Sequence, residues 1–221
     1  MNSRLDATYH IPIMDAIKEH LRKYAEEVTV VGDERVSKAI ILPGRFKRVY
    51  VEEGCGITFF AGRNIGELDP IDKKYLSFSQ HEKRIKEELI IHEDMILVTC
   101  SGTIGKVALV PKHWENWAMT HDIIRVIAAN EAINGYLYIW LQTEYASALM
   151  KALSYGSVVR HIEKEHLSSL PFPMLKNKEV QWEINALALN ANRKRYEAYK
   201  LEQEALRILD KYVIFAKRPI P

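Results

Sequence analysis

Cysteine is scarce in this 221-residue sequence, which contains only Cys55 and Cys100. Two cysteines without a Cys-x-x-Cys pair supply neither a disulfide framework nor a paired zinc-ligand motif, and they suit a reducing compartment. No uncharged apolar run approaches the length of a membrane span, and the first residues lack the apolar core of a signal peptide. We therefore expect a cytoplasmic protein that does not enter a membrane.

Neither sign of charge dominates the chain. It carries 31 Lys and Arg against 29 Asp and Glu, so the formal net charge at pH 7 is only +2. A nucleic-acid partner would therefore be held by local basic patches rather than by an overall electrostatic field. The length and the 48% hydrophobic content suffice for one large domain, or for one medium domain with an appendage.

Motifs of cofactor and catalytic sites are also missing. The turn that ends in Lys106 fails as a phosphate-binding P-loop, because Cys100 stands at the position of its first glycine and Val107 at that of its hydroxyl. His161 and His166 are wrongly spaced for a His-Glu-x-x-His zinc pair. Neither a nucleophile elbow nor a dinucleotide fingerprint is present. We expect no catalytic residue, no metal site and no cofactor.

What the sequence does contain is a β-rich middle between helical ends. Apolar positions at helical spacing predict an amphipathic helix over residues 13–27 and a further helical segment over residues 134–153. Runs rich in β-branched and aromatic residues predict strands between them. These runs comprise a basic strand-turn region at residues 35–50, then residues 56–61, 89–98, 107–110 and 122–127.

A small polar turn joins two of these predicted strands. Gly102 and Gly105 can adopt backbone angles that are closed to other residues. Ser101, Thr103 and Lys106 add two hydroxyls and one cation. A phosphate or a base edge would suit this tip, and so would water.

The strongest periodic feature lies in residues 180–212. Apolar residues alternate there at intervals of four and three, which is a heptad a/d register interrupted by Lys194. This pattern predicts a coiled-coil helix of roughly 50 Å at 1.5 Å per residue. We expect it to pack against a partner helix, or against the body of its own chain. The candidate partner-facing residues are Ile184, Leu187, Ala191, Ala198, Leu201 and Ile208.

The order of these pieces resembles the DNA specificity (S) subunits of type I restriction-modification systems. The resemblance covers roughly residues 40–212 and ends with the long helix; Arg4-Leu5-Asp6-Ala7 is similar to the segment that often opens such a domain. In chain order the matching segments are residues 56–66, Asp94-Met95-Ile96-Leu97-Val98 with Ser-Gly-Thr-Ile-Gly, Thr120-His121-Asp122, Gly135-Tyr136-Leu137-Tyr138, Gly156-Ser157 and Leu167-Ser168-Ser169-Leu170-Pro171-Phe172-Pro173.

The resemblance implies an α/β (α+β) fold with a β-rich target recognition domain, flanking helices and a long C-terminal coiled-coil helix. The recognition domain would span residues 1–175 and the helical spacer residues 176–217. Such a protein is a non-catalytic reader of double-stranded DNA, which grips the major groove at one half of a split target. Its helices set the spacing and dock methyltransferase subunits and, where present, a restriction subunit.

Residues in the matched loops are the candidates for DNA contact under this resemblance. Side chains with hydrogen-bonding groups can reach base edges, whereas lysines, arginines and hydroxyls can grip phosphates. The candidates are Lys47, Arg48, Arg63, Asn64, Ser101, Thr103, Lys106, Ser157, Arg160 and His161.

The chain departs from the family in having one recognition domain and one spacer where members commonly have two of each. It could be a half-subunit that forms a homodimer through its heptads, a fragment of a longer protein, or the recognition region of a fused type II restriction-methylation enzyme. A self-contained nuclease with an unrecognised site, and a structural protein in which the heptads dominate, are the alternatives from other functional classes.

Overall fold

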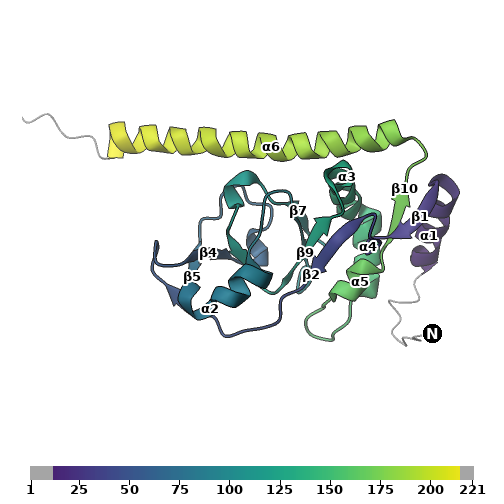
Figure 1. Cartoon of the computed structure of the whole chain (residues 1–221), viewed down its shortest axis with the longest axis horizontal. Helices are drawn as coiled ribbons and strands as arrows, with labels where there is room; N and C mark the ends of the chain where they lie inside the picture. The colour runs from purple at the N-terminus through teal and green to yellow at the C-terminus, as the bar shows by residue number, and fades with distance from the viewer. Residues whose placement is uncertain (1–11, 215–221) are drawn as a thin grey trace, which may run out of the picture.

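The computed structural model describes residues 12–214, and its most prominent feature is a long helix that runs along one side of a mixed α/β body (Figure 1). The Arg4–Ala7 segment and the outermost ends of both expected domains lie outside the described residues. Within the described part, no helix is long and apolar enough to cross a membrane.

The described residues form both helices and strands. The helices are α1 (Pro12–Tyr24), α2 (Phe78–Arg84), α3 (Glu131–Gln142), α4 (Glu144–Leu153), α5 (Lys164–Ser168) and α6 (Lys178–Leu209), with short 3₁₀ or π turns η1 (Gly62–Asn64), η2 (Ile85–Leu89), η3 (Lys112–Trp114) and η4 (Asp210–Ile214). The strands are β1 (Glu27–Val30), β2 (Ser37–Ile41), β3 (Tyr50–Val51), β4 (Ile57–Phe60), β5 (Lys74–Leu76), β6 (Ile96–Thr99), β7 (Val107–Leu109), β8 (Ala118–Met119), β9 (Ile123–Ala128) and β10 (Pro171–Met174).

The central sheet is antiparallel, with the order β2-β9-β6-β7. All four residues of β6 are buried, because the sheet is covered on both faces. Ile96 and Val98 join the core formed with α3 and α4, whereas Leu97 points to a second cluster around Trp114. This two-sided burial explains why β6 is apolar from Ile96 to Val98 rather than alternating.

Two smaller sheets complete the body. One has the order β3-β5-β4-β8, in which β4 and β8 are parallel. The other pairs β1 with β10 and so joins the start of the described chain to the segment just before α6. The predicted combination of a β-rich domain, flanking helices and a long C-terminal helix is confirmed.

Two predictions about individual elements were wrong. The apolar run over residues 89–98 becomes a strand only from Ile96, and the preceding turn is the π-helical η2. The helical segment over residues 134–153 is two helices, because Thr143 takes an extended conformation and caps α4 by accepting a hydrogen bond from the Ala146 amide at 3.1 Å. Threonine favours such capping positions because its hydroxyl replaces a missing backbone acceptor.

Helix α6 comes very close to α3. Its Asn185 amide oxygen accepts the backbone N–H of Gly135 at 2.7 Å and of Tyr136 at 3.2 Å, and its amide nitrogen donates to the Glu131 carbonyl at 3.0 Å. A Cβ atom added to Gly135 would lie 2.3 Å from the Asn185 carbonyl oxygen. The absence of a side chain at Gly135 is therefore a condition for this helix packing.

Two further contacts fix α6 along its length. Asn192 donates at 2.9 Å both to an Asp94 carboxylate oxygen and to the Val110 carbonyl. The His113 ring stacks on Tyr199, with 4.0 Å between ring centroids and 7° between planes. The helix thus packs against the body of its own chain, which is one of the two arrangements expected from the sequence.

The heptad residues lie mostly on the opposite side of α6 and face outward. Leu187, Leu201 and Ile208 are 62%, 73% and 46% exposed, and Ala191 and Ala198 are also exposed, whereas Ile184 is half-buried. The side facing the body combines a few apolar residues that pack on the core, such as Ala188, with polar and aromatic ones, among them Asn185, Asn192 and Tyr199. The apolar stripe found in the sequence is therefore largely free of intramolecular packing.

Candidate nucleic-acid interface

The turn between β6 and β7 is held by its own backbone and by Thr99. The Thr99 hydroxyl donates to the Thr103 carbonyl at 2.5 Å and accepts the Lys106 amide at 2.9 Å. Gly102 and Gly105 have φ of 71° and 83°, the left-handed region that favours glycine. Inside this fixed turn, the side chains of Thr103 and Lys106 are exposed.

A second predicted loop lies directly beside this turn. Residues 155–161 form a short hairpin whose neighbouring backbone bonds to the turn: the Gly102 amide donates to the Arg160 carbonyl at 3.1 Å, and the Ile162 amide donates to the Cys100 carbonyl at 2.9 Å. A bridge also pairs Ser101 with His161. Six of the ten candidates for DNA contact are thereby brought together: Ser101, Thr103, Lys106, Ser157, Arg160 and His161.

The hairpin's ends are fixed by one carboxylate. Glu163 accepts the Tyr155 hydroxyl at 2.5 Å and lies 3.3 Å from the His161 Nε2 atom. The hydrogen bond to Glu163 raises the pKa of Tyr155 to about 12, so the hydroxyl stays protonated and donating. Ser157 sits at the exposed end of the same hairpin.

The connection between β2 and β3 contributes two further basic candidates. Lys47 is exposed, whereas the Arg48 side chain is half-buried and donates to the Thr120 hydroxyl at 3.0 Å. The same Arg48 nitrogen lies 3.2 Å from His121 Nδ1, which identifies that ring nitrogen as the acceptor. Burial lowers the pKa of His121 from its usual value, and Arg48 adds to this effect, so the neutral ring is favoured.

A buried arginine holds the Thr120-His121-Asp122 turn in place. Arg125 is 1% exposed, and its guanidinium donates to the carbonyls of Met119, Thr120, Ile123 and Leu89 at 2.7, 3.1, 2.6 and 3.2 Å. Burial lowers its pKa to about 9, so the group remains charged at neutral pH. Arg125 thus positions the segment that in turn binds Arg48.

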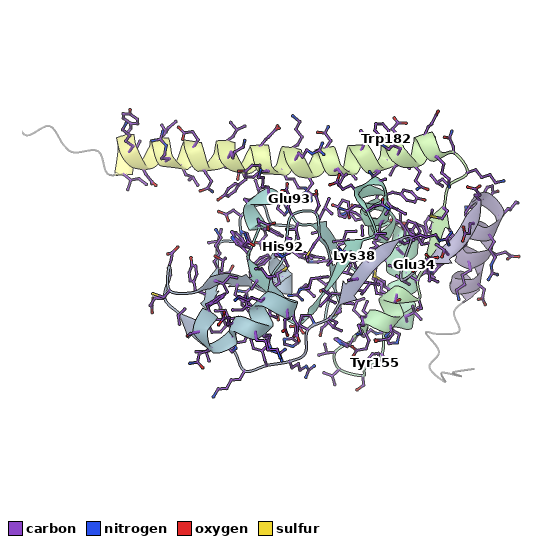
Figure 2. All side chains as sticks on the ribbon, viewed as in Figure 1. Glu34, Lys38, His92, Glu93, Tyr155 and Trp182 are labelled. Carbon is purple, nitrogen blue, oxygen red and sulfur yellow. The ribbon has the colours of Figure 1, made fainter. Side chains whose placement is uncertain are left out.

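An open hollow of about 560 Å³ lies between the β2–β3 connection, the Thr120-His121-Asp122 turn and the hairpin with the residues that follow it. Its lining includes Arg45, His121, Tyr155, His161 and Lys164. Figure 2 shows Tyr155 at the edge of the body farthest from α6, on which Trp182 is labelled. The turn at residues 99–106 and the hairpin at residues 155–161, together called the loop cluster, therefore lie on the opposite side of the protein from the long helix.

Two candidates lie apart from this cluster in their contacts. Arg63 is exposed and forms an ion pair with Asp72. Asn64 is only 2% exposed, and its amide nitrogen lies within hydrogen-bonding distance of Glu67 and Asp72 carboxylate oxygens. In this conformation the Asn64 side chain stabilises its own turn.

Other reactive groups offer little chemistry at this site. Cys100 is buried, and burial raises the pKa of its thiol to about 12, so the thiolate needed for nucleophilic attack is not formed at neutral pH. Among residues 12–214, no three histidine, cysteine or acidic side chains gather as a metal site.

Sequence reasoning missed Arg45 and Lys164 as members of this surface and Arg125 as its support. Arg45 belongs to the basic region noted at residues 35–50, so composition already pointed to it. Nothing in the sequence distinguishes Arg125 from an exposed arginine, except that it stands between apolar residues of a predicted strand.

A family model for the Type I restriction modification DNA specificity domain matches residues 71–186, which are 116 of the 221 residues. No curated protein is significantly similar to the chain.

Two solved structures with TM-scores above 0.5 share the fold at low sequence identity, and a third is similar with a lower score. The HsdS subunit from Thermoanaerobacter tengcongensis is 17% identical with a TM-score of 0.53, and the match covers 87% of this chain and 46% of that one. A chain described under "Structural basis underlying complex assembly and conformational transition of the type I R-M system" is 16% identical with a TM-score of 0.55, covering 91% and 48%. The S subunit from M. genitalium is 13% identical with a TM-score of 0.49, covering 73% and 37%. The chain thus spans less than half the length of each of these solved chains.

Proposed function

This chain belongs to the family of type I restriction modification DNA specificity domains, and we propose that it reads one half of a bipartite target in double-stranded DNA without catalysing a reaction itself. It acts in the cytoplasm as the recognition part of a type I-like restriction-modification system. The catalytic steps belong to methyltransferase subunits and, where present, a restriction subunit that dock on it.

The observation that carries this proposal is the convergence of three loops distant in sequence. The turn at residues 99–106 and the hairpin at residues 155–161 are joined through their backbones, and His121, which contacts Arg48 of the β2–β3 connection, lines the same hollow as the hairpin. Exposed Lys47, Lys106 and Arg160 supply cations for phosphates, and the hydroxyls of the turn supply donors for base edges.

The exposed apolar residues along the outer side of α6 indicate that this helix binds a protein partner. Large apolar side chains such as Leu187 and Leu201 are more than half exposed along one line of the helix. Burying each of them is worth about 1.5–3 kcal/mol, so a second helix that covers the stripe would bind favourably. We propose a second copy of this chain as that partner, with a homodimer presenting two recognition surfaces for a split target.

The experiment measures, by fluorescence anisotropy, the affinity of the full chain for a pool of random 30-base-pair duplexes at a series of salt concentrations. Lys106→Ala should weaken binding to all sequences and reduce the slope of log K against log salt by about one for each copy of the chain bound, because each copy loses one phosphate contact. Lys200→Ala is the matched control, since Lys200 is exposed on α6, away from the loop cluster. If wild type, Lys106→Ala and Lys200→Ala show equal salt slopes, the turn does not contact the DNA.

Two further measurements test the rest of the proposal. Incubation of the full chain with plasmid and Mg²⁺ should leave the DNA intact, and cleavage without added subunits would instead establish a self-contained nuclease. Sedimentation should give twice the mass of the chain, whereas a monomer at micromolar concentration would contradict the homodimer.

A further inference from the structure

The hairpin at residues 155–161 is tightly closed, and its backbone conformation requires a glycine at position 156. Its ends exchange two backbone hydrogen bonds, from the Tyr155 amide to the His161 carbonyl at 3.0 Å and from the His161 amide to the Tyr155 carbonyl at 2.8 Å. Gly156 has φ of 105°, and an added Cβ would lie 2.3 Å from the Val159 carbonyl oxygen. The backbone of this hairpin is therefore narrowly defined.

The base of the hairpin is also held by side chains. Glu163 binds Tyr155 and contacts His161, and the Arg160 guanidinium donates to the Ser154 hydroxyl at 3.2 Å. The Gly102 amide adds a bond from the neighbouring turn. These contacts hold the tip in one place relative to the rest of the loop cluster.

The tip itself carries two adjacent valines that face water. Val158 is 94% exposed and Val159 is 55% exposed. Tight turns favour Gly, Asn, Asp, Ser and Pro, and β-branched apolar residues contribute nothing to them. These valines contradict local turn chemistry in a loop whose backbone is otherwise well fixed, and such a conflict indicates a functional contact.

Cations surround this apolar tip. Arg160 follows it directly and is exposed, as are Lys164 and Arg45, which line the adjacent hollow with Val159. Of the two carboxylates in the same lining, Glu163 is bound by Tyr155, and Glu165 lies 3.9 Å from the Lys164 ammonium. An apolar point flanked by cations matches the major groove of DNA, where phosphates border the groove and the thymine methyl is the apolar group on its floor.

We propose that hairpin 155–161 enters the major groove and that Val158 contacts the 5-methyl group of a thymine, which makes Val158 a specificity-determining residue. This inference rests on the proposed DNA-binding function. The major groove admits a two-stranded β-ribbon, so it has room for this hairpin, which is closed by one isolated bridge between Tyr155 and His161. Apolar side chains are the usual partners of the thymine methyl.

The test compares duplexes that differ by a single methyl group. The preferred target of the full wild-type chain is first selected from random duplexes, and each thymine is then replaced in turn by deoxyuridine. One replacement should weaken wild-type binding about fourfold, the value of one buried methyl group. Val158→Ala should bind the thymine and deoxyuridine duplexes equally.

Val30→Ala is the matched control, because Val30 is a 41%-exposed valine on β1 and should keep the wild-type preference. Val158 is nearly fully exposed, so its truncation leaves the fold intact. Duplex binding that is insensitive to every replacement, or equally sensitive in wild type and Val158→Ala, would overturn this inference and leave the proposed function standing. Failure of wild type to bind any duplex would instead overturn the proposed function and this inference with it.

Discussion

Replacing Arg125 by methionine tests whether one buried guanidinium holds the recognition surface together. Methionine has similar length and no hydrogen-bond donors, so the substitution withdraws the donors of four carbonyls without opening a large cavity. A buried polar group left without its partner costs about 1–3 kcal/mol. At about 1 kcal/mol for each of the four carbonyls, the free energy of unfolding should fall by about 4 kcal/mol. This loss is a large part of the roughly 5–15 kcal/mol by which a typical domain is stable.

The assay is urea unfolding at pH 7, followed by circular dichroism and extrapolated linearly to water. Arg125→Lys keeps the charge but loses the planar fork that reaches four carbonyls, so about half of the loss should remain. Arg195→Met on the exposed side of α6 is the control and should change the free energy of unfolding by less than about 0.5 kcal/mol. A loss below about 1 kcal/mol for Arg125→Met would refute the reasoning, because it would mean that the carbonyls find other donors.

Three other predictions concern α6 and its contacts. Gly135→Ala should destabilise the chain by about 2 kcal/mol or more in the same urea assay, because the new methyl group would collide with the Asn185 backbone. Burial lowers the pKa of His113 in the folded chain below its value in the unfolded chain. As the pH drops from 7 to 5 the unfolded chain therefore takes up a proton first, so the free energy of unfolding should fall. His113→Gln should flatten this part of the curve of unfolding free energy against pH. Leu187→Glu together with Leu201→Glu should convert a sedimenting dimer to monomer without changing the thermal unfolding midpoint by more than a few degrees, since both leucines are exposed in the single chain.

Much of the fold could be predicted from the sequence because its signals are local. β-branched runs gave the β6–β7 pair, and a regular apolar period gave the long C-terminal helix. The break at Thr143 was not predicted, because threonine is tolerated within helices and caps them equally well. The π-helical η2 was not predicted either, since its apolar residues contact the core at positions that also suit a strand.

The candidate site was predictable only in part. The turn that ends in Lys106 was identified by its turn chemistry and the Gly156-Ser157 loop by the family resemblance, and the structure joins them through Gly102 and Arg160. The side chain of Asn64 could not be judged from sequence, because whether an asparagine faces a ligand or its own turn depends on neighbours such as Asp72. The roles in DNA contact assigned to individual residues remain predictions.

The sequence by itself determined the elements that follow from local periodicity and turn chemistry: a β-rich domain, tight glycine turns and a helix with an apolar stripe. Only the tertiary structure decided which side of that helix packs on the body. Asn185 and Asn192 satisfy buried backbone groups that exist only once α3 and β7 are in place, so these polar residues face inward, whereas Leu187 and Leu201 remain outside. Long-range backbone pairing likewise decided that the turn and the hairpin share one surface, because no local pattern encodes a contact between residues about 60 positions apart.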